Sequence, residues 1–157
     1  MRNLAIAALP VLALAACSGG SESLQPGQWD MTFAVTDVSG EGVTEAMRDE
    51  IAGELDRELA MESTCISEAQ AAAPDESLVL NSEVISECNI GESVFENGTI
   101  DIAGTCGDGG DGGEIAVTGT YSATGIDAEM TATIRDGGQE FSFAGNITGE
   151  RTGDCPG

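Results

Sequence analysis

Apolar and polar side chains alternate along residues 28–38, just after Pro26-Gly27. Such alternation is typical of a strand with one face on a core and the other in solvent. The next apolar positions recur at every fourth residue, which predicts an amphipathic helix over about residues 43–61. These positions are Val43, Met47, Ile51, Leu55 and Leu59. We expect the ridge to pack on the protein's own sheet; a partner helix or a membrane surface is the alternative.

From Val84 onward, alternating segments are separated by the turn signals Asn97-Gly98, Thr124-Gly125 and Gly137-Gly138. On the first segment the inner face is expected to be interrupted by a bulge at Gly91. Its predicted inner residues are Val84, Cys88, Ile90 and Val94. The whole pattern predicts a mainly β fold, an antiparallel meander sheet or open barrel with one amphipathic helix inserted after the first strand.

The first residues have the form of a secretory signal peptide. A basic start at Arg2 precedes an apolar run over residues 4–16, which is shorter than the roughly 20 residues that span a bilayer. Leu14-Ala15-Ala16-Cys17 resembles the lipobox of bacterial lipoproteins, in which the cysteine is acylated and becomes the first residue. The alternative is an ordinary signal with an incidental cysteine. We therefore expect a signal peptide over residues 1–16, a lipid-anchored tether over 17–26 and a β domain over 27–157.

A lipobox implies a location in the bacterial cell envelope, with the acyl chains on Cys17 in a membrane and the domain in the periplasm. Each buried CH₂ of an acyl chain contributes about 0.8 kcal/mol, so several chains together would anchor the protein stably in the membrane. Ser18 follows the cysteine, and by analogy with enteric bacteria a residue other than aspartate there favours the outer membrane.

The remaining cysteines are even in number, which in an exported chain predicts two disulfides. They are Cys65, Cys88, Cys106 and Cys155. A three-residue loop over residues 96–98 would place Cys88 opposite Cys106, which favours the pairs Cys88–Cys106 and Cys65–Cys155. The other two connectivities remain open. A zinc site is disfavoured because no CxxC spacing and no histidine are present.

Charge narrows the function classes. The chain has 28 acidic residues, five arginines, no lysine and no histidine, for a net charge of −23. Histidine-dependent nucleophiles and lysine-dependent phosphate or Schiff-base chemistry are excluded. Nucleic acid is a poor partner for so acidic a surface. Pairs of acids that could hydrolyse glycosides are too common in this composition to indicate an enzyme. We expect a non-enzymatic protein without a cofactor.

Two binding sites can be formulated from the residues. An open barrel with small inner side chains can leave a cavity for a small apolar ligand. Its predicted lining is Trp29, Phe33, Tyr121, Met130, Phe141 and Phe143. The alternative is that these residues form an ordinary core.

The second candidate is a calcium site in the glycine-rich loop that follows Cys106. Asp108, Asp111 and Glu114 present three carboxylates there, and calcium prefers such oxygen ligands. The spacing is not that of an EF-hand, and a solvated hairpin loop is the alternative.

Four motifs in order carry a family resemblance: residues 24–32 (LQPGQWDMT), residues 64–68 (TCISE), the Cys88 to Cys106 hairpin, and residues 149–155 (GERTGDC). Together they resemble the exported proteobacterial family catalogued as domain of unknown function 3617, over residues 24–155. The resemblance implies an exported β-rich domain and supplies no activity. We therefore expect an envelope lipoprotein with a structural or interaction role, in contact with another envelope protein. Binding of an apolar ligand or of calcium is the alternative.

Overall fold

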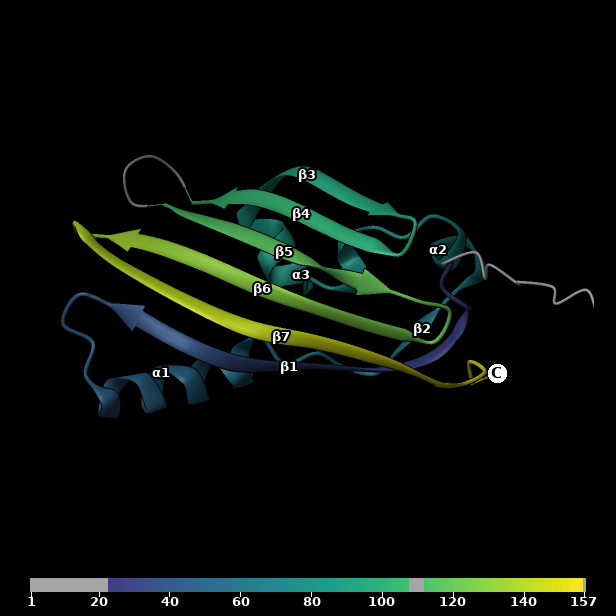
Figure 1. Ribbon diagram of the computed structural model, residues 1–157, viewed down its shortest axis with the longest axis horizontal. Helices are drawn as coiled ribbons and strands as arrows, with labels where there is room; N and C mark the ends of the chain where they lie inside the picture. Colours follow the sequence, from purple (N-terminus) through teal and green to yellow (C-terminus); the bar gives the residue numbers. More distant parts are fainter. Residues whose placement is uncertain (1–22, 108–111, 157) are drawn as a thin grey trace, which may run out of the picture.

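The computed structural model describes residues 23–107 and 112–156. Seven strands form one antiparallel sheet in the order β2-β1-β7-β6-β5-β4-β3 (Figure 1). The strands are β1 (Gly27–Gly40), β2 (Thr64–Ile66), β3 (Cys88–Glu96), β4 (Thr99–Cys106), β5 (Gly113–Tyr121), β6 (Gly125–Asp136) and β7 (Gln139–Gly153). The helices are α1 (Glu45–Glu58), α2 (Glu68–Ala72), the 3₁₀ turn η1 (Glu76–Leu78) and α3 (Ser82–Glu87).

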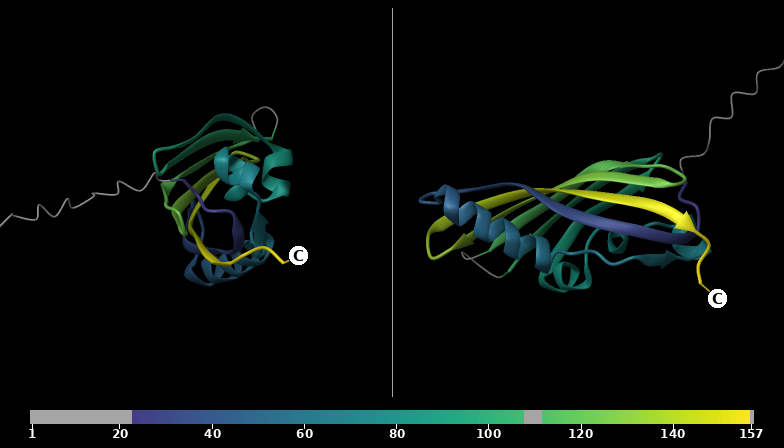
Figure 2. Two further views of the ribbon diagram at one scale, coloured as in Figure 1. Left: turned by 90° about the vertical axis from the view of Figure 1, so that its right-hand side faces the viewer. Right: turned by 90° about the horizontal axis from the view of Figure 1, so that it is seen from below.

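The sheet is a meander that curls into a half-barrel. Strands β3 to β7 follow one another as hairpins, and β1 then pairs with β7 on its far side. Figure 2 shows the sheet bending around its concave face, with the helices on that side. This confirms the predicted mainly β antiparallel fold with a helix after the first strand. No helix in the described part of the chain is both long and apolar enough to cross a membrane.

The core lies between the concave face of the sheet and the chain segment over residues 64–80, which runs from β2 to just past η1. The alternating residues predicted to face inward supply most of it, because every second side chain of a strand points to the same face. Buried sheet residues are Trp29, Met31, Val38, Ile100, Ile102, Ile115, Val117, Tyr121, Ile126, Ala128, Met130, Ala132, Phe143 and Ile147. Ile66, Ala71, Leu78, Val79 and Leu80 cover them from the other side.

Helix α1 is shorter and less buried than predicted. The Thr44 side chain caps the start of the helix by accepting a hydrogen bond from the Met47 backbone N–H at 3.4 Å. The helix ends at Glu58 rather than at residue 61. None of its residues is buried, and Met47 is 45% exposed. The helix lies along β1, where the Asp56 carboxylate accepts a hydrogen bond from the Val35 N–H at 2.7 Å. Its ridge therefore touches only the border of the core.

The segment before β3 is a helix, which corrects the prediction of a strand from Val84. The Asn81 side chain accepts a hydrogen bond from the Val84 N–H at 2.9 Å and thereby caps α3. Such a cap stabilises a helix start by about 1 kcal/mol. Val94 also departs from the prediction: it points outward, because the bulge between Ile90 and Glu92 shifts the register and turns Ser93 and Phe95 inward.

Both disulfides have the favoured connectivity. Cys65 is bonded to Cys155 with a Cα–Cα distance of 5.5 Å, and Cys88 to Cys106 with a Cα–Cα distance of 3.9 Å. The route to the second pair differs from the expected three-residue loop. Glu96 pairs with Thr99 across a two-residue turn, and the bulge at Gly91 then brings Cys88 opposite Cys106. Asn97 and Gly98 both have positive φ, as a two-residue hairpin turn of this kind requires.

Candidate functional site

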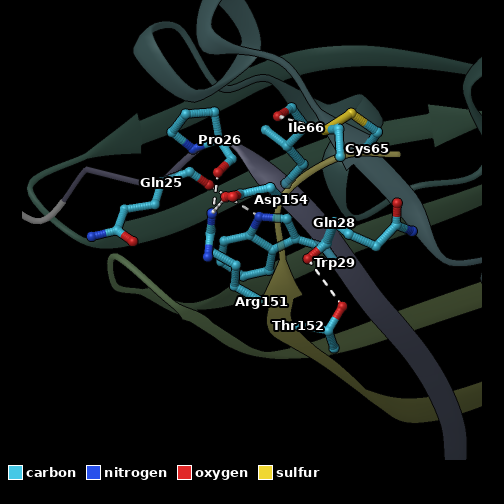
Figure 3. A network of polar contacts seen from close by, with 10 residues as sticks. Gln25, Pro26, Gln28, Trp29, Cys65, Ile66, Arg151, Thr152 and Asp154 are labelled. Carbon is cyan, nitrogen blue, oxygen red and sulfur yellow. Dashed lines mark hydrogen bonds and ion pairs between the residues drawn. A yellow bond between two sulfur atoms is a disulfide. The ribbon is translucent and has the colours of Figure 1, made fainter. Parts of the chain in front are cut away.

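One end of the sheet is closed by the chain that enters the domain; we call it the closed end (Figure 3). Trp29 is fully buried there, and its indole N–H donates to the carbonyl of Gln25 at 3.1 Å. The Gln25 N–H in turn donates to the carbonyl of Ala123 at 3.0 Å. Leu24 is buried beside them. The entering segment is thus bonded across the end of the concave face.

Arg151 holds the entering segment from the other side. Its guanidinium donates to the Pro26 carbonyl at 2.9 Å and pairs with Asp154 at 2.8 Å. Gly27 has a φ of +147°, and a Cβ on it would overlap the Gly153 carbonyl and lie 2.7 Å from Arg151 Nε. The disulfide to Cys155 lies next to this network. Three of the four sequence motifs that carry the family resemblance therefore meet here in structural contacts.

An apolar groove opens on the concave face toward the opposite end, which we call the open end. Leu55 of α1 and Leu59, the residue that directly follows the helix, form one wall, and Val84 of α3 with the Cys88–Cys106 disulfide forms the other. The floor is the inner face of the sheet, at Ile115, Ala132, Ile134 and Phe143. The groove has a volume of about 240 Å³.

The groove exists because the two helices leave part of the sheet uncovered. Helix α1 packs along β1, and α3 lies over the inner face near Met130 of β6, so the part of the floor around Ile134 is left between them. Ile134 is 42% exposed on this floor. With Met47, it is one of two large hydrophobic side chains exposed among the described residues.

Carboxylates stand around this apolar floor. Three glutamates line the groove: Glu58 at the end of α1, and Glu83 and Glu87 on α3. Glu114 on β5 also borders it, but its side chain lies on the outer face of the sheet, because the neighbouring Ile115 points inward. Glu114 is paired with Arg135 at 3.6 Å, and Arg135 also pairs with Glu140 at 3.1 Å. The other three make no salt bridge within the part of the chain that the structure describes.

The six residues predicted to line a ligand cavity all lie on the inner face of the sheet but not around one cavity. Trp29, Tyr121 and Met130 are buried in the core. Phe33 and Met130 border a hollow of only about 10 Å³, too small for a ligand. Phe141 is half-buried against Phe143, with ring centroids 6.2 Å apart. Phe143 alone of the six lines the groove.

The sequence did not predict that the other lining residues form a groove. Leu55 and Leu59 were visible as a helical stripe, and Ile115 and Ile134 as inward strand positions. No pattern in the sequence tells how far apart two helices lie on a sheet, and it is this separation that leaves the floor exposed.

The calcium candidate is only partly placed. Asp108 and Asp111 lie outside the described residues, and Glu114 is engaged by Arg135. Within residues 23–107 and 112–156, no three acidic or cysteine side chains are grouped so that they could hold a metal ion.

Three larger hollows among the described residues are less suited to a ligand. One of about 640 Å³ lies on the outer face of β3 to β6, one of about 780 Å³ lies at the turns of the closed end, and one of about 320 Å³ lies beside Arg135 where β4 ends and β5 begins. Glycine, threonine and other polar residues make up most of their lining. The groove differs because large apolar side chains from two helices and the sheet converge on it.

The fold and the groove define a class: a half-barrel sheet, stapled by two disulfides, with a partly covered concave face. The chain belongs to DUF3617, the family described as "Protein of unknown function", which matches residues 24–155. No curated protein and no solved structure matches the chain.

Proposed function

We propose that the protein is a lipid-anchored, non-enzymatic binding protein of the bacterial envelope that takes a small apolar ligand in the groove. The observation that carries the proposal is the exposed apolar floor at Ile134 between two helical walls. An exposed apolar surface of this kind costs about 25 cal/mol per Å² while it faces water, and a ligand that covers it recovers this free energy. Rimmed apolar patches commonly mark ligand or partner sites.

The size of the groove limits the ligand. Small-molecule sites typically measure about 300–1,000 Å³, and this groove is slightly smaller. A single alkyl chain or one small ring system suits such a space better than a folded lipid with several chains. The lining offers aliphatic side chains and one phenyl ring, with carboxylates only at the edge, and this favours an apolar body in contact with the floor.

The lipobox at Cys17 supports the anchor, and the closed end supports an orientation. Leu24 is already part of the fold, seven residues after Cys17, so the tether spans at most about 25 Å. Along β7, Arg151 at the closed end and Phe141 at the open end are ten residues, or about 33 Å, apart. In this proposal the groove opens away from the membrane, where a periplasmic ligand can enter it.

The non-enzymatic role in this proposal rests on composition, because a chain without histidine and lysine lacks the nucleophile pairs and Schiff-base chemistry that need them. An outer-membrane location facing the periplasm and contact with another envelope protein remain part of the proposal. Their support is Ser18 after the lipidated cysteine and the resemblance to exported proteins.

A fluorescence titration with the neutral apolar probe N-phenyl-1-naphthylamine tests ligand binding. The protein is the mature chain, residues 17–157, with Cys17→Ser to omit the lipid. We expect saturable binding that Ile134→Gln weakens severalfold. Met47→Gln is the matched control, because Met47 is equally exposed but does not line the groove. Absence of saturable binding would leave the interaction role as the better account.

A further inference from the structure

We propose that the ligand of the groove carries a positive charge, and that it is a single-chain cationic amphiphile such as a long-chain primary amine. This inference rests on the proposed binding function and specifies its ligand. It is carried by the position of three glutamates, Glu58, Glu83 and Glu87, at the edge of the apolar floor.

The three glutamates border one groove because the end of α1 is hydrogen-bonded to the start of α3. The Asn81 side chain, which caps α3, donates its amide N–H to the carbonyl of Glu58 at 3.4 Å. Glu83 and Glu87 are four residues apart on α3 and therefore lie on the same side of that helix. Val84 between them contributes to the wall. A molecule lying on the floor is therefore bordered by Glu58 at the α1 wall and by Glu83 and Glu87 at the α3 wall.

None of the four arginines in the described chain, Arg48 included, forms a salt bridge with these glutamates. Arg57 is next to Glu58 in sequence, but its Nε donates to the Gly53 carbonyl of its own helix at 2.9 Å. Arg135 is engaged by Glu114 and Glu140, and Arg151 is at the closed end with Asp154. The like charges of Glu83 and Glu87 repel each other at this spacing, so a bound cation would relieve a repulsion as well as add an attraction.

The end of α1 adds to the preference. This 14-residue helix terminates at Glu58 beside the groove, and the carbonyl end of a helix carries a partial negative charge that favours cations. Among the hollows of the described residues, this groove combines carboxylates with a lining of large apolar side chains. The floor therefore selects an alkyl chain, and the edge selects a cationic head over a neutral or anionic one.

Isothermal titration of the mature chain with Cys17→Ser tests the charge preference. The probes are dodecylamine, dodecanol and dodecanoate, which share one chain and differ in head charge, used below their aggregation concentrations. We expect the amine to bind about tenfold more tightly than the alcohol, with the acid weakest, as a few partly screened charge pairs would give. Raising the salt concentration should lower the affinity for the amine and not the affinity for the alcohol or the acid.

Two matched double variants separate the groove from the overall charge. Glu83→Gln/Glu87→Gln should bring the amine close to the alcohol, whereas Glu129→Gln/Glu150→Gln removes the same charge from the outer face and should leave the preference intact. The inference is overturned if amine and alcohol bind equally, or if both double variants act alike; alcohol binding then still supports the proposed function. If no probe binds, the proposed function fails as well.

Discussion

The two ends of this half-barrel are built from the same strands but differ in how the concave face is covered. At the closed end, residues 24–27 cross the concave face, Trp29 is completely buried, and Arg151 ties the entering chain to the last strand. At the open end, the same concave face bears Ile134 at 42% exposure, between helices that do not meet over it. Buried side chains and long-range hydrogen bonds lie at one end, and an exposed apolar surface is left at the other.

The motifs that identify the family lie mostly at the closed end. Gly27, Trp29 and Arg151 each have a structural contact that explains the residue type: a close approach, an indole hydrogen bond and a carbonyl-bound guanidinium. The groove is formed chiefly by residues outside these motifs. In our proposal the motifs hold the fold together, whereas mostly other positions would contact a ligand, and the predictions that follow test this division.

The largest effect is expected from the disulfides. Cys65–Cys155 closes a sequence separation of 90 residues at the closed end, and Cys88–Cys106 closes one of 18 at the groove. The loop-entropy estimate gives a stabilisation of about 4.6 and about 3.2 kcal/mol respectively. Replacing each pair by serine and measuring urea unfolding should show the greater loss for Cys65–Cys155. An equal or reversed order would contradict the loop-entropy account of the two disulfides.

A comparable contrast is expected for side chains at the two ends. Trp29→Ala should lower the free energy of unfolding by about 3–5 kcal/mol, because it removes a completely buried indole and leaves a cavity. Leu59→Ala, in the half-buried groove wall, should cost only about 1–2 kcal/mol. Circular dichroism measures unfolding of both variants. Tryptophan fluorescence cannot follow Trp29→Ala, because Trp29 is the sole tryptophan. Trp29→Phe is the control for the indole hydrogen bond, and similar losses for alanine at both sites would break the comparison.

The strand pattern explains how much of this could be predicted. Alternation identified the inner face because one face of an antiparallel sheet meets solvent, and Gly91 marked the bulge correctly. Helix α3 escaped because six mostly polar residues carry no periodicity, and its cap at Asn81 is a local hydrogen bond. The spacing of α1 indicated a helix but not how deeply it packs.

The groove and the closed end could not be derived for a different reason. Pro26 and Arg151 meet across a separation of 125 residues through a carbonyl and a guanidinium, and sequence periodicity contains no trace of that contact. The distance between α1 and α3 depends in the same way on the curl of the sheet, to which close-packed glycines contribute. Both features follow from tertiary geometry.

Glycine 145 illustrates that close packing. A Cβ at Gly145 would overlap the ring of Phe33, which lies across it from β1. Gly145→Ala should therefore destabilise the fold by about 1–3 kcal/mol, as overpacking does. In the background Phe33→Leu the loss should be smaller, because the smaller side chain can give way, and a double-mutant cycle by urea unfolding measures the difference. Strictly additive losses would argue against this contact.

The smallest effect is expected for Gly53, in the interior of α1, where a Cβ would meet nothing within 4 Å. Gly53→Ala should raise the free energy of unfolding by about 0.5–1 kcal/mol, because alanine loses less backbone freedom in a helix. Thermal unfolding measures the gain, and a loss would show that α1 is not helical at this point.

Binding of the fluorescent probe by the same variant gives a second result. Gly53 does not line the groove, so unchanged affinity indicates a preformed wall, whereas weaker binding by the more stable variant indicates that α1 must move to admit the ligand.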